Sequence, residues 1–263
     1  MTIKKLQMVF LGCLITTTAL AGSRMRDYYN ESSWPIVATL SVGPGWARPG
    51  ETQTLTLQPQ IEKAYVPNPT SRALRFVNTT KHTDTLAAGE FFLGLYGDVN
   101  SVVEGQLGLA FGMSSQARLG GTIYEDADPA FNNYSYSYKI RNSRIGVKIK
   151  ALYKTGYYDV IAYLSGCAAV GTNNSARYRI APLLDTEVPS PFFSNNNSTT
   201  LSYNFAVGVE APVDPNWRVG LGYEYANWGK SQLARAPEQT VGSGLTLGNL
   251  RVQELMVSLT YIM

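Results

Sequence analysis

The sequence predicts an all-β protein that closes into an eight-stranded antiparallel transmembrane β-barrel, with long external loops and short periplasmic turns. Three observations predict this fold. Apolar and polar residues alternate along several segments, long and short connections alternate between those segments, and the chain opens with an export signal. We expect a cleaved signal peptide at 1–21, a short periplasmic segment at 22–34 and the outer-membrane barrel domain at 35–263.

The N-terminal segment has the three parts of a secretory signal. Lys4 and Lys5 precede an apolar run at 8–15, and small residues ending at Ala21 follow. The run is shorter than the roughly 20 apolar residues that a membrane-spanning helix needs, so we expect export and cleavage after Ala21. In the alternative, Cys13 carries a lipid, but the apolar stretch continues past that cysteine.

Charge and composition argue against one class of partner. Once the two signal lysines have left, 20 of the 22 basic residues face 19 acidic residues. A nearly neutral chain argues against a nucleic-acid partner, because nucleic-acid binding depends on basic surfaces. The 24 glycines and 17 tyrosines suit a thin-walled barrel with aromatic belts.

Alternation of residue type is clearest at 103–113, 201–211 and 217–225. In 201–211 the odd positions hold Leu, Tyr, Phe, Val, Val and Ala, whereas the even positions hold Ser, Asn, Ala, Gly and Glu. Because successive side chains of a strand point to opposite faces, this pattern predicts lipid on one face and a polar lumen on the other. A soluble β-sandwich or lipocalin-like barrel also alternates, but it buries its apolar face in a packed core.

Four further strands have a weaker pattern, at 35–46, 88–97, 138–150 and 157–169. In 138–150 the apolar parity slips between Ile140 and Ile145, which predicts a β-bulge near Asn142 and Ser143. In 157–169 either parity fits. These segments complete the expected set of eight strands with the last one at the C-terminus.

The C-terminal strand alternates in the same way and resembles the strand that the outer-membrane assembly machinery reads. Such strands usually end in Phe, and here Met stands at the end, which puts assembly efficiency rather than fold in question. The expected assembly signal consists of Leu255, Val257, Leu259, Tyr261 and Met263.

The connections alternate strictly between long and short, which places both termini in the periplasm and makes the strand number even. The expected turns are 98–101, 151–156 and 212–216. The expected external loops are rich in Asn, Ser, Thr, Pro and Gly, belong in water and could hold an extracellular ligand. These loops are 47–87, 114–137, 170–199 and 228–251.

Several stretches resemble the small outer-membrane β-barrel proteins related to the transmembrane domain of OmpA and to the opacity proteins. The resemblance spans nearly all of the mature chain, and its markers are the sequences VEGQLG at 103–108, YEDADP at 124–129, GYEY at 222–225 and WGKS at 228–231. It implies an integral outer-membrane protein that lacks the peptidoglycan-binding domain of full-length OmpA.

The lumen of an eight-stranded barrel is too narrow for a wide aqueous channel, so side chains fill it. Buried charges need partners, so we expect Arg144 to meet Glu224, Glu254 or both. A structural plug is favoured over a gate that opens. The expected lumen network consists of Glu104, Arg144, Lys148, Lys150, Glu210, Arg218, Glu224 and Glu254.

Tyrosines and tryptophans near the strand ends predict two aromatic belts at the membrane surfaces. The external belt would hold Tyr134, Tyr136, Tyr138 and Trp228, and the periplasmic belt would hold Tyr153, Trp217 and Tyr261. The competing interpretation is a platform on which carbohydrate stacks.

We expect no catalysis, no cofactor and no metal. The only histidine, His82, lies in the first long loop without the acid and serine partners of a catalytic triad. Glu125, Asp126 and Asp128 could in principle bind calcium, but they lack the glycine and the distal glutamate of a calcium loop.

Taken together, these patterns predict an integral outer-membrane barrel with a structural or surface-interaction role, such as adhesion or host contact, through its external loops. The alternative is a narrow porin-like channel for passive diffusion of small solutes. The expected partners are outer-membrane lipid, lipopolysaccharide and the outer-membrane assembly machinery, with no nucleic acid.

Overall fold

The computed structural model describes residues 34–48, 52–58, 61–67, 84–157, 159–183, 192–235 and 244–263. Within these ranges no helix is long and apolar enough to cross a membrane. The expected signal peptide and the single histidine of the sequence, His82, lie outside the described residues. The described strands are β1 (Ile36–Arg48), β2 (Gln53–Gln58), β3 (Ile61–Pro67), β4 (Asp84–Asp98), β5 (Val103–Ser114), β6 (Ala117–Glu125), β7 (Asn132–Lys154), β8 (Ile161–Pro182), β9 (Asn196–Pro212), β10 (Trp217–Gln232) and β11 (Thr246–Ile262).

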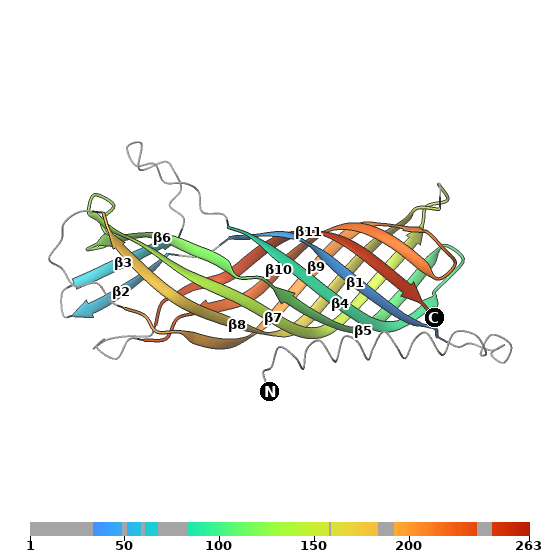
Figure 1. The fold of residues 1–263 in the computed structure, drawn as a ribbon, viewed down its shortest axis with the longest axis horizontal. Coiled ribbons are helices and arrows are strands. Elements are labelled where there is room, and N and C mark those ends of the chain that lie inside the picture. Colours follow the sequence, from blue (N-terminus) through green and yellow to red (C-terminus); the bar gives the residue numbers. More distant parts are fainter. Residues whose placement is uncertain are drawn as a thin grey trace, which may run out of the picture.

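Eight of these strands form a closed antiparallel ring, in the order β1-β4-β5-β7-β8-β9-β10-β11 (Figure 1). The first and last strands of the chain close it, with Val37 opposite Ile262 and Leu40 opposite Leu259. The prediction of an eight-stranded antiparallel barrel is confirmed. The ring leaves its strands without free edges, so backbone donors and acceptors pair around its whole circumference.

Three short connections lie at the same end of the barrel as the C-terminus (Figure 1). They join β4 to β5, β7 to β8 and β9 to β10, close to the turns expected from the sequence. In the last of them, the Val213 and Asp214 amides donate to the Trp217 carbonyl. This end is therefore tightly built.

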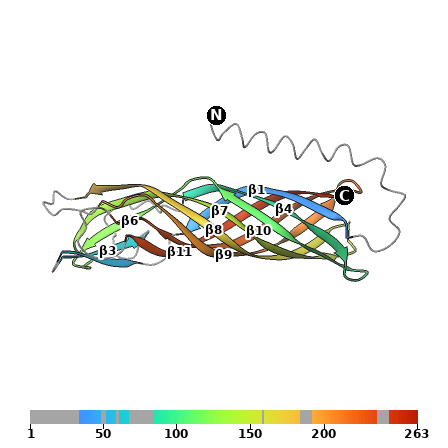
Figure 2. The ribbon, with the colours of Figure 1, turned by 90° about the horizontal axis from the view of Figure 1, so that it is seen from below.

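The opposite end is an extension of the sheet rather than a set of irregular loops. β6 pairs with the first half of β7, at 132–140, whereas β5 pairs with the second half, at 143–153. β3 pairs with β6, and β2 pairs with β3, so these strands continue the wall beyond the ring (Figure 2). The expected loops are therefore wrong wherever strands occupy them. β2, β3, β6 and the start of β7 lie within 47–87 and 114–137, and the ends of β8 to β11 extend into 170–199 and 228–251.

A band of apolar side chains faces outward around the ring. On β7 it runs over alternate positions from Ile145 to Tyr153, and the next outward residues toward the extension are Ser143 and Arg141. Nine residues match the roughly 9 to 11 that a tilted strand needs to cross a bilayer. Exposed members on the other ring strands include Leu40, Val42, Leu93, Leu95, Leu107, Leu109, Phe111, Leu164, Val170, Phe205, Val207, Leu221, Tyr223, Val257 and Leu259.

The bulge expected near Asn142 and Ser143 is not there. From Tyr134 to Leu152 the even-numbered residues of β7 face inward, and the pairing of β7 with β8 is unbroken at 142–143. On its other side β7 changes partner here, from β5, which ends its pairing opposite Ser143, to β6, which begins opposite Ile140. The register shift lies between Ser137 and Lys139, where β7 meets β8. The apparent slip in the sequence arises because the interior itself changes from charged to apolar along the barrel.

Candidate functional site in the barrel interior

The middle of the barrel interior holds a cluster of two cations and three carboxylates. Arg144 Nη2 lies 3.0 Å from Glu224 Oε1 and 4.0 Å from Glu90 Oε2, and Arg144 Nη1 lies 3.9 Å from Glu254 Oε1. Lys148 donates a hydrogen bond to Glu90 and lies 3.7 Å from Glu224 Oε2. All five side chains are about nine-tenths buried or more, so each charge depends on its neighbours for the stabilisation that water would otherwise give.

Asn204 ties two of these carboxylates together. Its Nδ2 donates to Glu224 Oε1 at 2.5 Å and to Glu90 Oε2 at 3.5 Å. An amide donor adds attraction without adding charge, which matters in a cluster where carboxylates outnumber cations.

A second layer lies nearer the short turns. Lys150 donates to Glu210, and Arg218 Nη1 donates to Glu104 Oε2 at 2.8 Å. Lys154 Nζ lies 3.0 Å from Glu104 Oε1. The structure thus brings all eight residues of the expected network into pairs, and Arg144 meets both Glu224 and Glu254.

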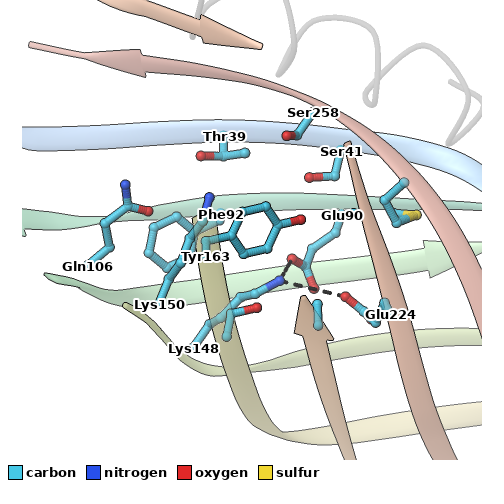
Figure 3. Close-up of a pocket in the computed structure, with 14 residues that line it drawn as sticks. Thr39, Ser41, Glu90, Phe92, Gln106, Lys148, Lys150, Tyr163, Glu224 and Ser258 are labelled. Carbon is cyan, nitrogen blue, oxygen red and sulfur yellow. Dashed lines mark hydrogen bonds and ion pairs between the residues drawn. The ribbon is translucent and has the colours of Figure 1, made fainter. Parts of the chain in front are cut away.

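Little space remains between the layers. Figure 3 shows Glu90, Lys148 and Glu224 pointing toward one another, with Tyr163 beside them and Gln106 on the far side of the same pocket. The cavity that these side chains line measures about 30 Å³, which holds no more than a few water molecules. This part of the lumen is filled by side chains.

A layer of amides and one tryptophan separates the charged zone from the extended end. Asn142 Nδ2 donates to Asn173 Oδ1 at 2.8 Å, and Asn173 Nδ2 donates to the Trp228 carbonyl at 2.8 Å. The Arg144 guanidinium carbon lies 5.7 Å from the centre of the Trp228 ring. Trp228 is fully buried and lies over the charged cluster on the side of the extended end.

Beyond Trp228 the interior is an aromatic and aliphatic core. Tyr65, Tyr136, Tyr178 and Phe193 contact one another edge-on or stacked, with ring centroids 5.1 to 6.4 Å apart. Other buried members include Leu86, Leu119, Ile123, Ile140, Leu233, Leu245, Leu250 and Val252. This core closes the lumen on the side of the extension.

The external aromatic belt expected from the sequence is wrong. Tyr134, Tyr136 and Tyr138 are 6%, 3% and 3% exposed, and Trp228 is 0% exposed, so all four lie inside. At this height their strands have passed the apolar band, and the outer face carries polar and charged residues. The apolar side chains therefore turn inward, and the polar residues Ser135 and Ser137 alternate with them on β7.

Residues of the other expected belt point outward at the short-turn end. Tyr153 is 54% exposed and Trp217 is 40% exposed, and the Trp217 and Tyr261 rings lie 4.7 Å apart. Leu255, Val257 and Leu259 face outward on β11, and Met263, which follows the strand, is also exposed.

Three interior residues were missed by the sequence reading. The side chain of Glu90 points inward on β4. Its even position in the sequence indicated this, because it places Glu90 on the opposite face of the strand from the apolar Phe91 and Leu93. Lys154, which is only partly buried, lies four residues beyond the expected strand end at 150, because β7 continues to this residue. Lys63 is 1% exposed on β3, a strand that the sequence reading assigned to a loop.

Lys63 lies outside the apolar band, with its ammonium 5.0 Å from the centre of the Tyr134 ring. Burial lowers the pKa of Lys63, and the Glu125 carboxylate on the paired strand opposes that change. A buried ammonium over an aromatic face is a partly compensated charge.

The acidic residues of the second expected loop form a turn. Asp126 and Ala127 have positive φ, and Asp128 Oδ1 accepts a hydrogen bond from the Ala130 amide at 2.9 Å. Glu125 accepts one from Asn133. In the part of the chain that the structure describes, no group of three or more metal-ligating side chains comes together.

Comparison with solved structures finds several membrane barrels. Neisserial surface protein A is 13% identical, with a TM-score of 0.43, and the match covers 87% of this chain and 97% of that one. OprG from Pseudomonas aeruginosa is 10% identical, with a TM-score of 0.42 and coverages of 88% and 98%. The outer membrane protease OmpT from Escherichia coli is 15% identical, with a TM-score of 0.41 and coverages of 89% and 99%. No protein-family model and no curated protein matches the chain.

The charged cluster predicts opposite effects for two substitutions. We expect Arg144→Met to lower the free energy of unfolding by about 3 to 5 kcal/mol, because three carboxylates would face one cation in the buried cluster. Glu254→Gln removes the excess negative charge at nearly constant volume and should leave stability unchanged or raise it. Urea unfolding of refolded protein, followed by tryptophan fluorescence, measures both. Equal losses for the two variants would contradict the proposed charge balance.

Proposed function

We propose that this protein is an integral outer-membrane β-barrel that is exported through a cleaved signal peptide and acts through its extended end in surface contacts. The observation that carries the proposal is the outward band of apolar side chains around a closed ring with charged residues inside. A soluble protein would bury these Leu, Val and Tyr rows, whereas lipid solvates them. The short turns would face the periplasm and the extension the exterior.

The surface-contact role is supported by where the chain places its residues. β6, the first half of β7 and the end of β8 continue the wall beyond the apolar band, and β2 and β3 widen it. A closed interior at this height gives the extension a rigid core. Such a platform suits adhesion or host contact, whereas a channel would need an open path.

The proposal extends to how the barrel is assembled and to whether it catalyses a reaction. The outward residues of β11 would serve as the signal for the outer-membrane assembly machinery. We propose a non-enzymatic role, since the charged side chains inside the ring at the level of the apolar band are paired with one another and leave a cavity of about 30 Å³.

Two lysine substitutions on the outer face of β7 test the membrane location. Ile149→Lys, at the centre of the apolar band, should lower the free energy of unfolding in lipid vesicles by about 2 to 4 kcal/mol, because it puts a charge in hydrocarbon. Ser143→Lys faces outward on the same strand beyond the band and should cost at most about 1 kcal/mol. Equal effects in a urea titration of vesicle-folded protein would argue against a lipid-facing band.

The channel alternative is tested by planar-bilayer recording. Because ion pairs, Trp228 and the aromatic core fill the lumen in succession, we expect the refolded protein to show no steady conductance. A steady conductance that changes with Arg144→Ala or disappears with Glu224→Ala would favour a gated channel instead.

A further inference from the structure

A groove lined by cations lies on the outer face of the extended wall. Arg118 of β6, Lys139 of β7, and Arg177 and Arg179 of β8 line it, together with Ser137 and Tyr138. The groove encloses about 190 Å³. Arg141, two residues further along β7, is exposed on the same face. Five cationic side chains therefore lie within three adjacent strands.

A backbone irregularity brings two of these arginines to the outer face. Asn173 and Ser175 are fully buried, so the odd positions of β8 point inward up to this point. At Arg177 the φ angle is +60°, the pairing with β7 shifts, and Arg177 and Arg179 become exposed. Asn195 Oδ1 accepts a hydrogen bond from the Arg177 amide at 3.0 Å and holds this conformation. A positive φ at a residue other than glycine costs free energy, and such strain gathers at functional sites.

Two cations of the groove lie side by side. Arg118 and Lys139 are direct cross-strand partners, and both line the groove. Arg118 Nη2 also donates to Ser137 Oγ at 3.0 Å. Arginine side chains suit the oxygen geometry of a phosphate, because the planar guanidinium donates two parallel hydrogen bonds.

The height of the groove points to lipid as the source of the anion. On β7, Arg141 and Lys139 lie four and six residues beyond Ile145, the last outward apolar residue of the band. At about 3.3 Å per residue and a tilt near 45°, this places them roughly 9 and 14 Å above the hydrocarbon. The headgroup of a phosphorylated glycolipid in the same leaflet reaches this height, and its site must lie on the outer side of the wall, as the groove does.

We propose that this groove binds the phosphate groups of lipopolysaccharide in the surrounding leaflet. The inference rests on the proposed function, since it requires the extension to face the outer surface. It assigns the ligand to the side of the barrel rather than to its tip.

Calorimetric titration of the mature chain, refolded in zwitterionic detergent micelles, tests the site. We expect lipopolysaccharide to bind, and enzymatically dephosphorylated lipopolysaccharide to bind at least tenfold more weakly. Binding that ignores the phosphates would overturn the proposal, and this comparison needs no variant. Equal binding of soluble heparin fragments that displace lipopolysaccharide would also overturn it, because the site would then take a soluble polyanion.

A pair of double variants locates the site. Arg177→Gln with Arg179→Gln should weaken binding roughly 30-fold, given the usual contribution of each basic side chain near an anionic surface. Arg48→Gln with Arg251→Gln is the control, because these exposed arginines are cross-strand partners elsewhere on the rim and change the net charge equally. The control should change affinity less than about threefold, and equal losses would contradict a discrete groove.

Gel mobility without boiling, measured on the same samples, separates the two proposals. A heat-modifiable barrel that fails to discriminate phosphates would refute the groove and leave the proposed function standing. A protein recovered from the soluble periplasm would refute the proposed function itself.

Discussion

Closure of the sheet is the constraint on which the rest of this structure depends. Inside a bilayer no water can satisfy the backbone, so every amide and carbonyl must pair within the protein, and an open sheet would leave two bare edges. Pairing of β1 with β11 removes those edges. Once the ring is closed, alternation of side chains fixes the remainder. One set must face outward and the other must fill a lumen too narrow to hold much water.

The narrow lumen then determines its own chemistry. Charges placed there lose their hydration, so they persist only as paired groups, and the cluster around Arg144 and the pair Lys150–Glu210 are arranged in this way. Beyond the apolar band the outer face of the same wall carries polar residues. The interior there becomes apolar, and Trp228 lies at the change from charged to aromatic filling. Within the apolar band the barrel thus has charged residues inside and apolar residues outside. The extension has an apolar core and a polar surface, like a soluble protein.

This inversion explains which parts of the structure could be read from the sequence. The eight ring strands and their turns were predictable because alternation has the same period on either side of the bilayer surface. The orientation of the side chains beyond the apolar band was not predictable, because parity tells which residues share a face but not which face is the outer one there. Tyr134 and Tyr136 were therefore expected outside, and the slip near Asn142 was interpreted as a bulge.

Other features had no local signal. The pairing of Arg144 with Glu224 followed from parity and depth, but Glu90 joins that cluster from β4, a strand with few polar residues to mark its inner face. β2, β3 and β6 are short strands in polar surroundings, so composition assigned them to loops. The positive φ at Arg177 turns the side chains at the end of β8 to the other face of the sheet, whereas the sequence alone would predict an unchanged alternation there.

Lipid quenching on a single strand tests the central claim most directly. Two variants would each contain a single tryptophan, which lies on β10. One variant retains the native Trp228, and the other carries only the tryptophan introduced by Leu221→Trp. Both would be folded in vesicles whose lipids carry bromine at mid-chain. Leu221 faces outward in the apolar band, whereas Trp228 is buried above the charged cluster. The account predicts strong quenching at position 221 and little at Trp228. Equal quenching, or quenching of Trp228 alone, would contradict a wall with lipid outside and a filled lumen inside.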